Sequence, residues 1–215
     1  MYVKQIWRYP VKSMAGEQLQ TARLTSSGIE GDRIVQVRRG KGRIATARTW
    51  PDLLGFHATL DQAGEPLVDG KPWTDPAVLE AVQALVGADA QLVHDEDLDR
   101  FDILPILVVT DGAIAAFGLD GRRLRPNIVI GGVPGLEERT WEGGRIFIGD
   151  VAIGIHDLRD RCNMTMVDPD TLAYDPKVLR DIVKRFDGKL ALNCEVLEGG
   201  EIRVDQEVRV VRSGV

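Results

Sequence analysis

One cysteine in the second half of the chain stands among cationic residues. Cys162 follows Arg161 directly and Arg159 at three positions. Positive charge beside a thiol favours the thiolate, and a thiolate prefers soft metals. Cys162 is therefore a candidate metal ligand; the alternative is a buried, inert thiol, the commoner state of a single cysteine. The other cysteine, Cys194, lies in an apolar segment that fits the inert alternative, and we assign it no role.

Three further segments place polar side chains where a packed strand does not require them. Lys12 and Ser13 follow Tyr-Pro-Val, Arg33 follows Gly-Asp, and Arg125 begins an Arg-Pro-Asn sequence that ends at Asn127. If Lys12, Arg33 and Arg125 converge, they form a positive pocket that suits a phosphate. The Ser13 hydroxyl would add a donor. The alternative is that these charges are solvated or salt-bridged at strand ends.

Asp102 lies shortly before an apolar run that begins at Pro105, so we expect it at the mouth of a strand. It could cap a turn there, or it could act as an acid or base in a pocket. The histidines, His57, His94 and His156, are scattered along the sequence, and a core or surface role is favoured for each of them.

The elements expected around these residues are mostly strands, so the fold class is mainly β with a few helices (α+β). Apolar or alternating runs separated by turn residues, a pattern typical of a barrel or sandwich, occur at Tyr2–Tyr9, Gln18–Leu24, Arg33–Val37 and Phe56–Leu60. Further strands are expected at Pro105–Val109, Ile128–Ile130, Ile146–Ile148, Val151–Ile155 and Val208–Val211.

Helices are expected at Pro76–Val86, Ala113–Phe117 and Pro176–Phe186. Asp75 and Asp175 stand at the N-cap positions of the first and the third. A polar stretch dense in Asp and Glu, His94–Arg100, follows the first helix. We place a boundary in this stretch, which gives two lobes over residues 1–95 and 96–215.

The composition excludes several classes of protein. The chain has 215 residues, of which 44% are hydrophobic, and a net charge of −6. It therefore has no overall basic field for nucleic acid or anionic lipid. No apolar run is long enough for a membrane span and the N-terminus has no signal-peptide core, so we expect a cytoplasmic protein that does not bind membranes. Two cysteines are too few for an ordinary iron–sulfur cluster.

The polar segments, taken in order, resemble the MOSC family, which is named after the C-terminal domain of molybdenum cofactor sulfurase. The resemblance covers nearly the whole chain and is nearest to the branch of the mitochondrial amidoxime reducing component and its bacterial relatives. It rests on residues 9–13 and 28–33 for the N-terminal signature, 125–129 and 148–150 for the central one, and 161–171 for the cofactor-ligating segment. It implies a MOSC β-barrel over residues 96–215 and a β-rich N-terminal lobe over residues 1–95.

The same resemblance implies a molybdenum cofactor (molybdopterin) and roles for individual residues. The family's metal-ligating cysteine corresponds to Cys162, and an aspartate near the metal corresponds to Asp102, which makes both of them candidate catalytic residues. The residues that would hold the pterin and its phosphate are Lys12, Ser13, Arg33, Arg125 and Asn127.

The sequence departs from the family pattern at several positions near these segments. Arg159 stands where relatives have the first cysteine of a Cys-x-x-Cys, and Met14 stands where relatives often have Cys. Leu172 replaces a usual glycine, and Ala47-Arg48 replaces a usual Gln-Arg pair. Cofactor binding remains the expectation, while the substrate and the partner stay open.

The resemblance implies an oxidoreductase that reduces N-hydroxylated small molecules, and we expect its electrons to come from a separate protein, a ferredoxin or a flavoprotein reductase. No Gly-x-Gly-x-x-Gly opens a strand–helix unit, so the sequence indicates no dinucleotide site of its own. One alternative is a non-catalytic module that carries or handles the molybdenum cofactor or sulfur. Another is a barrel that binds a small ligand or a peptide without any cofactor.

Overall fold

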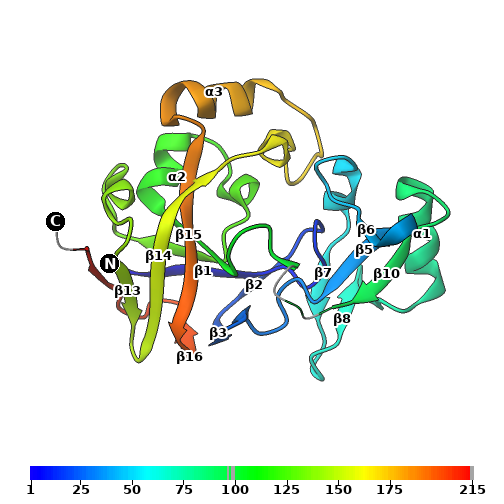
Figure 1. Cartoon of the computed structure of the whole chain (residues 1–215), viewed down its shortest axis with the longest axis horizontal. Coiled ribbons are helices and arrows are strands. Elements are labelled where there is room, and N and C mark those ends of the chain that lie inside the picture. Colours follow the sequence, from blue (N-terminus) through cyan, green and yellow to red (C-terminus); the bar gives the residue numbers. More distant parts are fainter. Residues whose placement is uncertain (96, 98–99, 214–215) are drawn as a thin grey trace.

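The computed structural model describes residues 1–95, 97 and 100–213. Its largest element is an eight-stranded sheet in the order β17-β13-β14-β15-β11-β12-β1-β2, and three small three-stranded sheets surround it (Figure 1). Three α-helices accompany these strands in the described part of the chain. The expected class, mainly β with a few helices, is confirmed.

The large sheet combines strands from both ends of the chain. Neighbouring strands are antiparallel except β11 and β12, which are parallel. Its members are β1 (Tyr2–Arg8), β2 (Glu17–Leu19), β11 (Ile106–Thr110), β12 (Ile128–Gly131), β13 (Arg145–Ile148), β14 (Val151–Asp160), β15 (Lys189–Glu198) and β17 (Arg209–Val211). Because β1 pairs with β12, the residues that follow β1 lie beside those that precede β12.

Each face of the large sheet has a hydrophobic core. One core contains Ile6, Ile128 and Ile146 and is closed by the small sheet of β3 (Thr21–Thr25), β4 (Gly28–Ile29) and β16 (Gly200–Arg203). The other lies under α2 (Asp111–Phe117) and α3 (Lys177–Phe186), which cover the sheet at the top of Figure 1. Burial of these apolar side chains holds the strand ends that carry the polar segments in fixed positions.

A second body, which we call the α1 lobe (residues 35–94), lies at the right of Figure 1. It holds the sheets β10-β5-β6 and β7-β8-β9 and has its own apolar core. Its elements are β5 (Val35–Arg39), β6 (Arg43–Ile44), β7 (Ala58–Leu60), β8 (Pro66–Val68), β9 (Lys71–Pro72), α1 (Pro76–Val86) and β10 (Gln91–His94). The short 3₁₀ helices η1 (Gly40–Gly42) and η2 (Pro51–Gly55) also lie in this lobe.

Several predicted elements are confirmed and others need correction. α3 begins at Lys177 with Pro176, not Asp175, at its N-cap position, although Asp175 Oδ1 accepts a hydrogen bond from Lys177 N at 2.9 Å. The helix at Pro76–Val86 has the expected bounds, and the Asp75 side chain accepts a hydrogen bond from the Ala77 nitrogen at 2.8 Å. The expected strand Gln18–Leu24 is wrong as one unit, because β2 pairs with β1 and β3 pairs with β16. The strand predicted from Arg33 begins only at Val35, because Arg33 has a φ of 57°, outside the strand region.

The expected boundary between two lobes falls on residues 95 and 96, and residue 96 lies outside the described residues. β1 and β2 precede this boundary but belong to the large sheet, and β3 and β4 pair with β16. The division of the chain into lobes 1–95 and 96–215 therefore stays a proposal. Within the described residues, no helix combines the length and the apolar character needed to cross a membrane.

Candidate functional site

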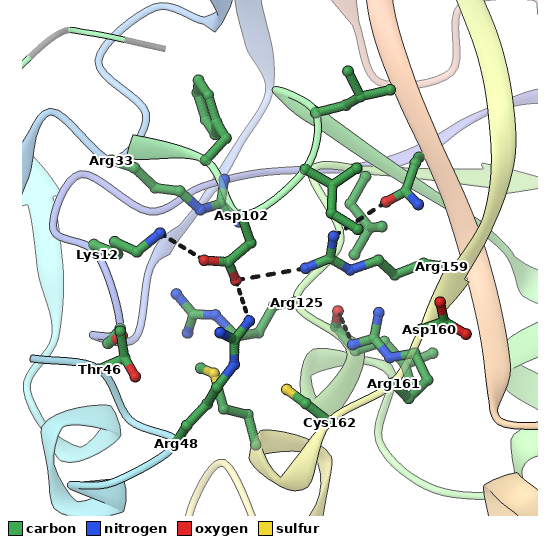
Figure 2. A pocket seen from close by; sticks show the side chains of 18 of the residues that line it. Lys12, Arg33, Thr46, Arg48, Asp102, Arg125, Arg159, Asp160, Arg161 and Cys162 are labelled. Atoms are coloured by element: carbon green, nitrogen blue, oxygen red, sulfur yellow. Dashed lines mark hydrogen bonds and ion pairs between the residues drawn. The ribbon is translucent and has the colours of Figure 1, made fainter. Parts of the chain in front are cut away.

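A cavity of about 90 Å³ lies between the α1 lobe and the large sheet (Figure 2). Its walls come from the loop after β1, from the α1 lobe and from the segment before β11. The end of β14 and the turn that follows it complete the lining on the other side. The structure brings all the candidate site residues together in its lining: Lys12, Ser13, Arg33, Asp102, Arg125, Asn127 and Cys162.

The backbone is left-handed at three of these residues. Ser13 has a φ of 71°, Arg33 of 57° and Arg125 of 54°. Residues other than glycine adopt this conformation rarely and at a cost of roughly 1–3 kcal/mol, and such residues concentrate at functional sites. Backbone hydrogen bonds hold two of them in place: Arg33 N donates to Tyr9 O at 2.8 Å, and Arg125 N donates to Arg122 O at 3.0 Å.

A buried aspartate, Asp32, fixes the wall that carries Arg33. Its Oδ1 accepts a hydrogen bond from Tyr9 N at 2.7 Å, and its Oδ2 accepts one from Asn127 Nδ2 at 3.2 Å and pairs with Arg33. The Asn127 side chain makes two further hydrogen bonds within the protein. Its Nδ2 donates to Trp7 O at 3.3 Å, and its Oδ1 accepts from Leu107 N at 3.1 Å. Asn127 therefore positions the wall, while the Arg33 guanidinium lines the cavity.

Asp102 lies at the centre of a cluster of cations (Figure 2). Its Oδ1 is 2.9 Å from Lys12 Nζ, and its Oδ2 is 2.5 Å from Arg48 Nη2 and 3.5 Å from Arg159 Nη2. Burial opposes ionisation of Asp102, but the charges of Lys12, Arg48 and Arg159 outweigh burial and hold its pKa below the usual value. Asp102 is therefore a carboxylate at neutral pH and accepts hydrogen bonds.

Two buried guanidinium groups have unsatisfied donors. Arg125 lies 4.2 Å above the centre of the Tyr9 ring, and Arg161 Nη2 donates to Leu124 O at 2.7 Å. Among the described residues, neither Arg125 Nη2 nor Arg161 Nε has a hydrogen-bond partner. Burial lowers the pKa of both groups to about 10, still charged at neutral pH. Buried donors without partners are costly, so they indicate an acceptor-rich ligand.

Cys162 ends the run from β14 and begins η6 (Asn163–Met166). Its carbonyl accepts hydrogen bonds from Thr165 N at 3.1 Å and from Thr165 Oγ1 at 2.8 Å, which fix the turn. The thiol is half-buried and lies on the same side of the cavity as Arg48 (Figure 2). The described residues contain no cluster of three or more His, Cys, Asp or Glu that could hold a metal ion. A metal at Cys162 would take its other ligands from a bound group.

The second cysteine has the environment expected for an inert thiol. Cys194 lies in β15, between β11 and β14, and is fully buried. Burial raises its pKa well above the usual value, so the thiol stays protonated.

A second hollow, of about 400 Å³, adjoins the cavity. The two share Arg123, Arg125 and Met164 in their linings. Leu172 has a left-handed backbone with a φ of 57°, and its Cδ1 lies 2.9 Å from the place that a Cβ on Gly55 would occupy. The second hollow is thus closed tightly against the α1 lobe at this point, and it extends the space available beside Cys162.

The loop that follows Cys162 is attached to η4 (Gly121–Leu124) by ion pairs. Arg123 Nη2 lies 2.7 Å from Asp168 Oδ2, and Arg122 Nη2 lies 2.7 Å from Asp170 Oδ2. Hydrogen bonds from Thr171 and from the Asp170 nitrogen lower the pKa of Asp168 to about 2. These contacts hold the thiol-bearing turn beside the segment that carries Arg125.

Two domain families match the chain. Residues 1–99 match the MOSC N-terminal beta barrel domain, and residues 110–209 match the MOSC domain. Together these matches cover nearly the whole chain, which therefore belongs to the MOSC family. The resemblance read from the sequence is confirmed at this level.

Named relatives lie in one branch of the family. The chain is 27% identical to mitochondrial amidoxime reducing component 2 from Macaca fascicularis, over 86% of this chain and 72% of that protein. It is 28% identical to mitochondrial amidoxime-reducing component 1 from Homo sapiens, over 86% of this chain and 71% of that protein. A crystal structure of the YuaD protein from Bacillus subtilis matches with a TM-score of 0.56 at 16% identity, over 99% and 96% of the two chains, which shows a shared fold.

Proposed function

We propose that the chain binds a molybdenum cofactor in this cavity and reduces N-hydroxylated small molecules. The observation that carries the proposal is a half-buried thiol beside two buried guanidinium groups, each of which has one nitrogen without a hydrogen-bond partner in the described part of the chain. A soft thiolate suits molybdenum, and unsatisfied cationic donors suit an anionic, acceptor-rich group. The names of the relatives, amidoxime reducing components, support the reaction class.

The residues present fit such a cofactor. Lys12, Arg33 and Arg125 supply positive charge for a phosphate, and Ser13 supplies a hydroxyl. Cys162 supplies the thiolate ligand. The adjoining hollow, lined by Trp7 among other apolar side chains, gives room for a fused-ring system. When bound, the cofactor supplies a metal that changes oxidation state by two electrons and takes up an oxygen atom.

The protein's own side chains would then have to supply protons. Reduction of an N–OH group to N–H with release of water consumes two electrons and two protons. Lys12 and Asp102, joined at 2.9 Å, would be the groups of this chain that hold and pass on a proton beside the bound cofactor. Because Asp102 is held as the carboxylate, it acts as the acceptor in this pair and Lys12 as the donor. Burial, partly offset by Asp102, lowers the pKa of Lys12, so its ammonium group is a stronger acid than that of an exposed lysine.

The electrons come from a separate protein in this proposal. Two cysteines cannot hold an ordinary iron–sulfur cluster, and one of them is assigned to the metal. A ferredoxin or a flavoprotein reductase is the kind of partner we propose. A cytoplasmic location, without membrane or nucleic-acid binding, is proposed from the composition alone.

Metal analysis and turnover test the proposal together. The protein is purified from a host that makes molybdenum cofactor, and its molybdenum content is measured. It is then mixed with benzamidoxime and a reduced artificial electron donor. We expect near-stoichiometric molybdenum and formation of benzamidine. Bound molybdenum without turnover would favour the non-catalytic carrier, and protein without molybdenum would refute cofactor binding.

A further inference from the structure

Two arginines at the cavity have no part in the cofactor contacts proposed above. Arg48 comes from the α1 lobe and Arg159 from β14, and both point at the Asp102 carboxylate from different walls (Figure 2). The Arg48 side chain is 40% exposed and lies at the mouth, whereas that of Arg159 is 17% exposed and lies deeper.

The positive charge around the cavity exceeds the negative charge. Arg33 is paired with Asp32, and Arg123 with Asp168. Among the described lining residues, the remaining cations are Lys12, Arg48, Arg125, Arg159 and Arg161, and the lining carboxylates are those of Asp102 and Asp160. A thiolate at Cys162 and a phosphate near Lys12 and Arg125 would offset this excess. Arg48 and Arg159 lie on the side of Asp102 that faces away from Lys12, where both approach Oδ2.

Both guanidinium groups are held in place and keep donors for a ligand. Arg159 Nη1 donates to Asn193 Oδ1 at 3.3 Å, and Asn193 Nδ2 in turn donates to Asp157 Oδ1 at 2.7 Å. Arg48 Nη2 is held by Asp102 Oδ2 at 2.5 Å. A guanidinium has five N–H donors, and the contacts with described residues use only some of them on each arginine.

We propose that Arg48 and Arg159 form an anion clamp beside Cys162, and that the physiological substrate is an N-hydroxylated compound that carries a carboxylate. This inference rests on the proposed function and specifies its substrate class. Asp102, the chain's own carboxylate between the two arginines, shows which chemistry the pair binds. Planar guanidinium groups bind carboxylates through paired hydrogen bonds, and a second carboxylate in the clamp would use the donors that Asp102 leaves free.

The test compares two matched probes, benzamidoxime and its 4-carboxy derivative, on molybdenum-loaded protein and on cofactor-free protein. Dissociation constants are measured by calorimetry without an electron donor, at one fixed ionic strength because salt screens such contacts. We expect the carboxylated probe to bind about tenfold more tightly or better, the effect of one charge-assisted hydrogen bond. With an electron donor, KM should follow the same order.

Variants assign the preference to the clamp. Arg48→Gln and Arg159→Gln should each bring the ratio of the two dissociation constants close to one. Arg159→Lys, which keeps the charge and loses the paired geometry, should restore part of the preference. The matched control is Arg145→Gln, since Arg145 is exposed on β13 and does not line the cavity, and its ratio should equal that of the unchanged protein. Molybdenum content and a thermal melt verify that each variant is folded and loaded.

Each outcome decides a separate claim. Equal binding of the two probes to the loaded, unchanged protein would overturn the clamp. If only the cofactor-free protein prefers the carboxylated probe and loading with cofactor removes that preference, the two arginines bind the cofactor. That result would overturn the clamp as well. Because binding is measured without turnover, a carboxylate preference in protein that reduces neither probe would refute the proposed reaction and leave the clamp standing.

Discussion

The ammonium group of Lys12 lies 2.9 Å from Oδ1 of Asp102, although 90 positions separate the two residues in the chain. Lys12 also donates to Arg100 O at 2.6 Å, and its side chain is 9% exposed. The loop after β1 and the segment before β11 are thus joined at the cavity by one buried cation. This contact couples the electrostatics of the site to the stability of the fold.

Asp102→Asn should remove a pH-dependent part of the stability. The folded protein holds the pKa of Asp102 below its unfolded value of about 3.9. The stabilisation is therefore fully present above that value and is lost as the pH falls through the folded pKa. Urea unfolding at several pH values should show a constant difference between the two proteins from neutral pH to about pH 5. The difference should shrink in more acidic solution; one that grows there would contradict the assignment.

Cys162→Ser should abolish turnover and lower the molybdenum content, because an alcohol is a much poorer ligand for a soft metal than a thiolate. The matched control is Cys194→Ser, which removes the other thiol from a fully buried strand position. That variant should keep cofactor and turnover and lose some stability, because it places a polar group among apolar side chains. Molybdenum analysis of both folded variants decides which cysteine is the ligand.

Arg125→Ala should release the cofactor while the fold survives. Its guanidinium stacks on Tyr9 and leaves Nη2 without a partner among the described residues, so its charge has little structural use. Loss of one charge-assisted contact to a phosphate costs roughly 1.5–3 kcal/mol, or about 10- to 150-fold in affinity. Cofactor affinity per folded molecule is the quantity to measure.

Lys12→Ala should weaken cofactor binding in the same way, although Lys12 also makes structural contacts. A thermal melt therefore accompanies the affinity measurement for both substitutions. If both variants unfold while the affinity of the folded fraction is unchanged, the two charges are structural and the phosphate lies elsewhere.

The candidate residues that line the cavity could be picked out from the sequence, but most of their contacts could not. Cys162 and Arg125 belong to short local motifs, and the bounds of α1 follow from Asp75 and from the helical spacing after it, so all of these can be read from neighbours in the chain. Asp32 and Arg48 were not recognised as organising residues. Arg48 and Asp102 are 54 positions apart in the chain and meet because the α1 lobe packs against the large sheet. No local sequence pattern predicts a contact between residues so far apart.

Glu138→Gln should remove a second pH dependence of the protein's stability, opposite in sign to the one that Asp102 causes. Glu138 is fully buried; its Oε2 accepts a hydrogen bond from Thr110 Oγ1 at 3.0 Å, and its Oε1 has no partner among the described residues. Burial raises its pKa, so its contribution is fully present below the unfolded value of about 4.3 and is lost as the pH rises through the folded pKa. The stability of the unchanged protein relative to Glu138→Gln should therefore fall with rising pH, as chemical denaturation can measure. A flat difference would show that folding leaves the pKa of Glu138 unshifted.

Molybdenum-loaded protein should not reduce benzamidoxime with NADH alone and should do so when an electron carrier is added. The chain has no Gly-x-Gly-x-x-Gly at a strand–helix junction to bind a dinucleotide, and its two cysteines cannot hold an ordinary iron–sulfur cluster. In the proposed function, electrons arrive from a second protein that docks transiently near the cavity mouth, where Arg48 is exposed. The experiment follows NADH oxidation and benzamidine formation with and without a ferredoxin or flavoprotein reductase system, and Cys162→Ser serves as the negative control. A full rate with NADH and no carrier would reveal a redox site within this chain and would remove the need for a partner.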